Sequence, residues 1–205
     1  MERILELGRL HENPGTVCFT GPRPAHIFPQ QPYDPSRRTD YQKIIEKIKE
    51  VILRLYGQGY TIFLSGGAQG FDQSAFWAVH YCKREIPELK NIVVRPFEGQ
   101  ERKWSRTGLF SQKEYEKMLL SADLILTCTK LTEDTKADAA KALHYRNQVM
   151  VTLSRIVIGM GEPEDWEKGK IRGGTGNCLK YAKEQKKQII VRPFREDPEL
   201  WDPDW

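Results

Sequence analysis

The sequence predicts an α/β protein with a Rossmann-like, doubly wound and mainly parallel sheet and helices on both faces. Three observations predict this class. Short β-branched apolar segments alternate with longer segments of helical periodicity along the 205 residues. Most of the strand segments are apolar on both faces, which is typical of parallel strands covered by helices. Glycine-rich turns follow two of the strands, at the edge of the sheet where such folds bind ligands.

Each predicted strand is a short apolar segment bounded by turn residues. The first, TVCFT, ends at Gly21-Pro22, and the second, YTIFLS, begins after Gly57 and Gly59. The third, NIVVRPF, follows Pro87. The six predicted strands cover residues 16–20, 60–65, 91–97, 122–129, 155–160 and 188–194. Because helical segments separate them, right-handed crossovers should place them in parallel.

The helices are predicted from apolar residues that recur every three or four positions. The longest covers residues 39–56, where Tyr41, Ile44 and Ile48 begin the apolar stripe. The other helices are predicted over residues 71–84, 112–121, 136–151 and 174–184. No linker divides the pattern, so we expect a single domain over residues 1–205 with its core at about residues 16–194.

Two segments do not fit the alternation. Residues 21–38 hold five prolines and are predicted as a long loop without a regular element. Residues 195–205 form an acidic tail with two tryptophans, EDPELWDPDW preceded by Arg195. The tail either folds back onto the surface through its aromatic rings or binds a partner.

Composition limits the function classes. The net charge is +4, and basic residues are spread along the chain, so the sequence does not favour a nucleic-acid surface but allows anionic small molecules. Cys18, Cys82, Cys128 and Cys178 form no CxxC pair and are expected to be reduced packing residues, with no metal site. The charged first residues and the lack of a long apolar segment predict a cytoplasmic protein without a membrane span.

Glycines, hydroxyls and cations gather at the predicted carboxyl ends of the strands. Glycine allows close approach of the backbone to a ligand, and a helix that begins there presents its positive end, so the set favours a phosphate or a similar anion. The predicted ligand-binding residues are Thr20, Gly21, Arg23, Ser65, Gly66, Gly67, Ala68, Gly70, Asp72, Phe97, Trp104, Thr127, Arg172, Gly173, Gly174, Thr175, Gly176 and Asn177.

Two glycine turns dominate this set, SGGAQGFD at residues 65–72 and RGGTGN at residues 172–177. Neither is a Walker A loop or a complete dinucleotide fingerprint. The alternative interpretation is that both are tight strand–helix turns, with Asp72 complementing the dipole of the following helix. Trp104, in a polar loop, either covers the pocket and stacks on a base or packs at the sheet edge.

With these residues in place, the chain resembles the SLOG superfamily, and within it the YpsA-like branch. The matching segments are FTGPRP, LSGGAQGFD, VRPFEGQERKW, ADLILT and GGTGNCLKYA, spread over residues 16–194 in the family's order. The resemblance implies a pocket for nucleotides or nucleotide-derived ligands such as ADP-ribose-like molecules, and the sequence assigns no definite cofactor besides such a ligand. It also makes a homo-oligomer plausible.

The resemblance leaves catalysis open. The related LOG enzymes cleave the N-glycosidic bond of nucleoside monophosphates with a glutamate in a PGGxGTxxE element, and aligning GGTGNCLK with it places Lys180 at the glutamate. Asp72 is the candidate replacement, but the helix dipole is expected to lower its pKa and keep it ionised. Glu98 and Glu101 are further candidates. If the protein is an enzyme, the prediction is therefore a nucleotide N-glycosidic hydrolase.

Three functions remain at this point. The first is a sensor or sequestering protein that binds a nucleotide-like ligand, and the second is the LOG-type hydrolase. The third is single-stranded DNA binding as in the related DprA proteins, through Arg23, Arg37, Arg38, Arg102, Lys103 and the ring of Trp104. Solvated surface cations are the alternative interpretation of that last set.

Overall fold

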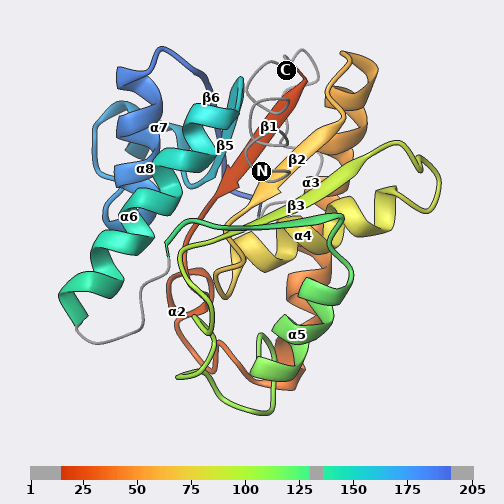
Figure 1. Ribbon diagram of the computed structural model, residues 1–205, viewed down its shortest axis with the longest axis vertical. Helices are drawn as coiled ribbons and strands as arrows, with labels where there is room; N and C mark the ends of the chain where they lie inside the picture. Colours follow the sequence, from red (N-terminus) through yellow and green to blue (C-terminus); the bar gives the residue numbers. More distant parts are fainter. Residues whose placement is uncertain (1–14, 130–135, 195–205) are drawn as a thin grey trace.

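The computed structural model describes residues 15–129 and 136–194, with the side chains of the second range described from residue 138. Six parallel strands form one sheet in the order β4-β3-β2-β1-β5-β6. Helices cover both faces of the sheet (Figure 1). The predicted doubly wound α/β fold is confirmed. Residues 1–14 lie outside the described residues, and so does the acidic tail, residues 195–205, for which the sequence predicts either packing on the surface or partner binding.

The strand bounds are close to the predicted ones. The strands are β1 (Thr16–Thr20), β2 (Ile62–Ser65), β3 (Lys90–Arg95), β4 (Leu124–Thr127), β5 (Ile156–Met160) and β6 (Gln188–Arg192). Val17 in β1 aligns with Phe63 of β2 on one side and Ile156 of β5 on the other. Strands β1, β2 and β5 are buried along their whole length, which explains why their sequences are apolar on both faces.

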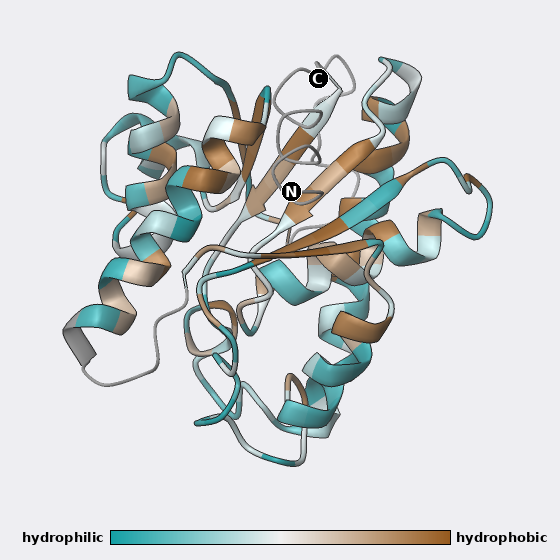
Figure 2. Ribbon diagram, viewed as in Figure 1, coloured by the Kyte–Doolittle hydropathy of each residue, from teal (hydrophilic) through white to brown (hydrophobic). Residues whose placement is uncertain are grey.

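Each face of the sheet has its own core. The face bearing Phe19 and Phe63 packs on α3 (Arg38–Gly57) and α4 (Phe71–Cys82), and α5 (Gln112–Leu120) extends this layer over β3. The face bearing Cys18 and Leu64 packs on α6 (Lys136–Leu153) and α8 (Gly173–Glu184). Figure 2 shows hydrophobic residues concentrated in the central strands. All four cysteines are free, and Cys18, Cys82 and Cys178 are buried, as expected for packing residues.

Short helices are where the prediction was wrong. The proline-rich segment 21–38 is not without regular structure, because it contains α2 (Pro24–Ile27) and the 3₁₀ helix η1 (Pro35–Arg37). A further short helix, α7 (Pro163–Glu167), lies between β5 and α8. All three have proline in the first turn, where a missing N–H breaks no helical hydrogen bond. One-turn helices of this kind leave too little periodicity in the sequence to be predicted.

Candidate functional site

A hollow lies where the strand order of the sheet reverses. The chain passes outward from β1 through β2 and β3 to β4, then returns to place β5 on the other side of β1. A cavity of about 770 Å³ opens at the carboxyl ends of β1 and β5, and we call it the β1–β5 cavity. It is lined by Thr20, Gly21, Pro22, Arg23, His26, Ala68, Asp72, Leu143, Arg146, Asn147, Met160, Gly161, Glu162, Asp165, Lys170, Ile171, Arg172, Gly173, Gly174 and Thr175.

The end of β1 supplies the first wall. Thr20 is 6% exposed, and the chain continues through Gly21 to Arg23 at the start of α2. Gly21 is required here because a Cβ at this position would lie 2.3 Å from the ring of Phe71. Burial lowers the pKa of Arg23, which Asp72 opposes. Arg23 nevertheless stays charged, because the ordinary pKa of an arginine lies far above neutrality.

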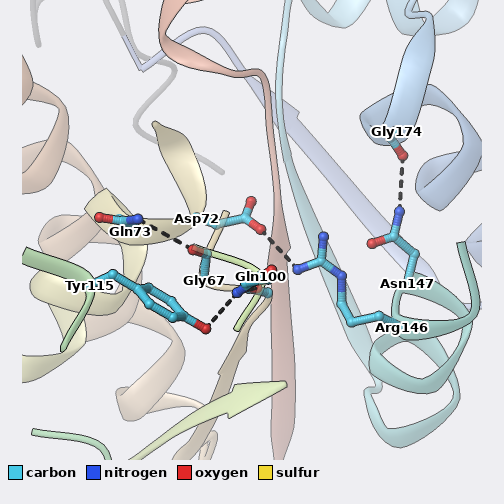
Figure 3. Close-up of polar contacts among 9 residues, drawn as sticks. Gly67, Asp72, Gln73, Gln100, Tyr115, Arg146, Asn147 and Gly174 are labelled. Carbon is cyan, nitrogen blue, oxygen red and sulfur yellow. Dashed lines mark hydrogen bonds and ion pairs between the residues drawn. The ribbon is translucent and has the colours of Figure 1, made fainter. Parts of the chain in front are cut away.

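In the first glycine turn, residues 66–70 are buried and closely packed against other parts of the protein. Gly67 has φ +66°, and a Cβ there would lie 2.9 Å from Tyr115 and Met118 of α5. Its carbonyl accepts from Gln73 Nε2 at 3.3 Å, and the Tyr115 hydroxyl lies 2.5 Å from Gln100 Nε2 (Figure 3). Of this turn, only Ala68 lines the cavity. Gly66, Gly67 and Gly70 therefore allow the close packing of the turn and do not form part of the cavity wall.

Asp72 extends from the start of α4 into the β1–β5 cavity and forms an ion pair with Arg146 of α6. The Arg146 Nη1 atom lies 3.4 Å from Asp72 Oδ2, and both side chains are 6% exposed. Asp72 also accepts backbone hydrogen bonds from Ala68 and Gly21. The N–H groups predicted to hold an anion from outside thus hold, in part, a carboxylate of the protein itself.

The expectation that the helix dipole lowers the pKa of Asp72 is wrong in its direction. Burial raises the pKa of this carboxyl, and Arg146, Arg23 and the two backbone donors oppose that effect without cancelling it. The physical reason is desolvation. The carboxylate is removed from water by burial, and the free-energy cost of this for the charged form exceeds the stabilisation that the helix N-terminus provides.

Helix α6 joins the two glycine turns; the helix itself was predicted from the sequence, but its residues Arg146 and Asn147 were not predicted to belong to the site. Arg146 reaches toward the first turn, while Asn147 Nδ2 donates to the carbonyl of Gly174 in the second at 3.2 Å (Figure 3). The Nε atom of Arg146 is buried and has no partner among the described residues. A signal was present: Arg146 is charged, yet it lies four residues from Ala142 and Met150, both 1% exposed, on the buried side of the helix.

The second glycine turn, residues 172–176, is open to the cavity. A Cβ on Gly173 or Gly174 would meet nothing within 4 Å, although Gly173 has φ +67°. Helix α8 begins here with no acidic residue in its first turn and no side-chain cap from Arg172. Gly176 serves packing, because its Cβ would lie 2.2 Å from the Ile171 carbonyl oxygen. This turn presents the N-terminus of a helix to the cavity.

Nine of the predicted residues do not line the cavity: the four glycines already described, Gly66, Gly67, Gly70 and Gly176, and the five residues Ser65, Phe97, Trp104, Thr127 and Asn177. Ser65 and Phe97 are 2% and 5% exposed, and Asn177 is exposed on α8. Trp104 packs edge-on against Tyr115 with ring centroids 5.1 Å apart, so it covers part of the α5 core. The hydroxyl of Thr127 accepts from Arg95 Nε at 2.8 Å. Phe97, Trp104 and Thr127 belong to the β3–β4 side of the sheet, away from the reversal of strand order.

The cavity also holds acidic residues that the sequence did not single out. Glu162 follows β5, and Asp165 lies on α7 with its carboxylate 4.0 Å from Lys170 Nζ. Within residues 15–129 and 136–194, no three metal-ligating side chains come together. Among the described helices, none is long and apolar enough to cross a membrane.

Comparison with known proteins identifies the family. The YpsA model, described as the YspA SLOG family, matches residues 18–196. The chain belongs to the YspA SLOG family. It is 31% identical over 148 residues to the SPbeta prophage-derived protein YoqJ of Bacillus subtilis, covering 69% of this chain and 78% of that protein. It is 25% identical to UPF0398 protein YpsA of the same organism, over 64% of this chain and 69% of that one.

Solved structures of DprA share the fold. DprA of Streptococcus pneumoniae superposes with a TM-score of 0.53 at 17% identity, over 89% of this chain and 51% of that one. DprA of Helicobacter pylori, a structure that concerns its single-stranded DNA binding mode, gives 0.50 at 18% identity, over 89% and 67%. This chain thus spans about half the length of the pneumococcal protein.

Proposed function

We propose that this SLOG protein binds a nucleotide or a nucleotide-derived ligand, such as an ADP-ribose-like molecule, in the β1–β5 cavity and acts as a sensor or sequestering protein. One observation carries the proposal: an uncapped helix N-terminus and arginine side chains line a cavity of about 770 Å³ at the reversal of strand order. This volume lies within the range of about 300–1,000 Å³ typical of small-molecule sites.

The phosphate end of the ligand belongs at the second glycine turn. Gly173 and Gly174 have open space where a Cβ would lie, so the backbone is open on that side, and the α8 dipole favours a negative charge there. Arg172 is exposed beside them, and Arg146 lines the floor. Asp72 holds one amino group of Arg146, so the guanidinium is fixed in place before a ligand arrives.

The sugar end of the ligand belongs near α7. Glu162 and Asp165 line the cavity on that side, and carboxylates are suitable acceptors for ribose hydroxyls. The cavity therefore carries cations at the second glycine turn and, beside α7, acids together with Lys170. This arrangement favours a ligand with both a phosphate and a polyhydroxyl group over a simple inorganic anion.

Thermal-shift measurements test this function against AMP, ADP-ribose, NAD and cyclic dinucleotides. We expect at least one of them to raise the melting temperature of the wild type and to have no effect on Gly174→Asp. The added carboxylate enters open space at a helix N-terminus, so the variant should fold normally. Gly57→Asp is the charge-matched control, because Gly57 ends α3 with nothing near its Cβ. The proposal fails if no ligand stabilises the wild type.

Nucleotide N-glycosidic hydrolysis is the second candidate, favoured by Asp72. This carboxyl lines the cavity, and burial raises its pKa toward the range useful for proton transfer. Lys180, at the position of the LOG glutamate, is exposed on α8 and does not line the cavity. Chromatography should show release of free base that is lost in Asp72→Asn. Intact nucleotides after long incubation with the wild type would exclude the reaction for those substrates.

Single-stranded DNA binding is the third candidate, and the H. pylori DprA comparison motivates it. The loop between β3 and α5 exposes Arg102 and Lys103 beside the half-buried Trp104. Gel-shift assays should show retention of an oligonucleotide that weakens steeply with salt if this surface binds the backbone. Absence of retention at low salt would exclude it.

A further inference from the structure

A second hollow lies on another side of α4, and we call it the α4 groove. It has a volume of about 290 Å³ and lies between α3 and α5, which flank α4 on the same face of the sheet (Figure 1). Gln73, Ser74, Trp77 and Tyr81 of α4 line it. None of these residues lines the β1–β5 cavity, so an inference about the groove does not depend on the proposed function.

The polar groups of α4 in this groove offer hydrogen-bond acceptors. Gln73 is fully buried and donates its amide N–H to Gly67, but no described residue donates to its Oε1 atom. The Ser74 hydroxyl donates to the carbonyl of Gly70 at 3.1 Å, which leaves its oxygen as an acceptor. A molecule that satisfies these atoms must bring N–H or O–H donors.

Two half-buried aromatic side chains of α4, Trp77 and Tyr81, form an aromatic surface in the groove. The rings of Trp77 and Tyr81, one helical turn apart, have centroids 6.3 Å apart and planes tilted by 30°. Both are half-buried, and the guanidinium of Arg84 lies 5.3 Å over the Tyr81 ring. Such a surface favours a planar ring stacked on it.

The charges at the rim limit the ligand further. Arg38 of α3 is exposed on one wall, while on the other wall Lys117 Nζ lies 2.8 Å from Glu114 Oε1. Because that pair neutralises itself, Arg38 and the Arg84 guanidinium over Tyr81 leave the rim positive, and the ligand is neutral or negatively charged. The small volume restricts it to one or two rings.

We propose that the α4 groove is a second binding site, for a planar nitrogen heterocycle of nucleobase size that carries an N–H donor. The ring stacks on Trp77 and Tyr81, and the donor binds Gln73 Oε1. Gln73 donates to Gly67 of the first glycine turn, and its neighbour Asp72 lines the other cavity, so both sites share the start of α4.

Ligand-observed NMR on the full chain tests this site with three probes: adenine, benzimidazole and 1-methylbenzimidazole. The last two differ in one N–H, which the methyl group removes. We expect saturable binding of adenine and benzimidazole, and binding of the methylated form about tenfold weaker, because it leaves the buried acceptor unpaired. Trp77→Leu should weaken adenine about tenfold, the loss expected for one stacking ring. Gly57→Asp, at the end of α3 and outside both hollows, should leave adenine binding unchanged.

Gln73→Leu removes the acceptor and should abolish the preference for benzimidazole over its methylated form. If Gln73→Leu fails to fold, Trp77→Leu tests the site instead, because Trp77 is only half-buried. The melting curve of Trp77→Leu then shows whether this variant is folded. The proposal is overturned if no probe binds, if methylation has no effect, or if Trp77→Leu binds adenine as tightly as the wild type does. It is also overturned if sedimentation shows that Trp77→Leu dissociates an oligomer, because a second copy then covers the groove.

Discussion

The two glycine turns have similar sequences but opposite surroundings. In the first, a Cβ on Gly66 would lie 1.4 Å from Arg146 Nη1, and one on Gly67 would meet two side chains of α5. In the second, a Cβ on Gly173 or Gly174 would meet nothing within 4 Å. The first turn needs glycine because the protein packs onto it, and the second leaves its backbone open to a ligand. A glycine-rich turn is therefore a candidate ligand-binding turn only when its backbone faces open space and is not packed against other residues of the protein.

Among substitutions in the two turns, Gly66→Ala should cause the largest change in the free energy of unfolding. The new methyl group would occupy the place of the Arg146 guanidinium, 1.4 Å away, and approach Asp72 Oδ2 at 2.6 Å. Because a buried ion pair is broken, we expect a loss of about 3 kcal/mol in the free energy of unfolding, measured by urea denaturation. Gly174→Ala is the matched control and should change it by less than about 0.5 kcal/mol. Equal effects of the two substitutions would contradict the assignment.

Gly67→Ala and Gly173→Ala form a second matched pair, with φ angles of +66° and +67°. Both substitutions carry the same left-handed strain of about 1 kcal/mol. Only Gly67→Ala adds a collision, at 2.9 Å from Met118 and Tyr115. We expect Gly67→Ala to destabilise by about 2 kcal/mol more than Gly173→Ala in the same urea assay. A difference near zero would mean that α5 does not pack firmly on the first turn.

The pH dependence of stability tests the environment of Asp72. Burial raises the pKa of this carboxyl in the folded protein, so between its ordinary pKa and the raised one the folded state binds more protons than the unfolded state. Stability contributed by Asp72 is therefore lost as pH rises through that interval. Wild type should lose stability relative to Asp72→Asn on raising the pH from about 4 toward neutrality, followed by urea denaturation at each pH. A relative gain for the wild type would show that Arg146 outweighs burial.

Gly174→Asp should have the smallest effect on stability. The carboxylate would enter open space in the first turn of α8, where the helix dipole favours it by about 0.5 kcal/mol. We expect a melting temperature equal to or slightly above that of the wild type by calorimetry. A clear decrease would mean that the second turn is packed in solution and does not face a cavity.

The fold could be predicted because its signals are local. Apolar residues on both faces of Thr16–Thr20 and Ile156–Met160 indicate buried parallel strands, and the carboxyl ends of such strands indicate the edge that carries a site. The difference between the glycine turns could not be predicted, because Arg146 lies 74 residues from Asp72 and packs there only through the tertiary fold. The position of Trp104 likewise depends on a tertiary contact, with Tyr115, which the polar sequence around it does not indicate.

Calorimetric titration of ADP-ribose into the wild type, Gly174→Asp and Gly57→Asp is the most direct test of the central claim, that the open second turn and the β1–β5 cavity hold a nucleotide-derived ligand. Saturable binding is predicted for the wild type and Gly57→Asp, with affinity at least about tenfold lower for Gly174→Asp, because the added carboxylate repels the phosphate. Equal affinities for the wild type and Gly174→Asp, or an absence of binding by the wild type, would contradict the claim for this ligand.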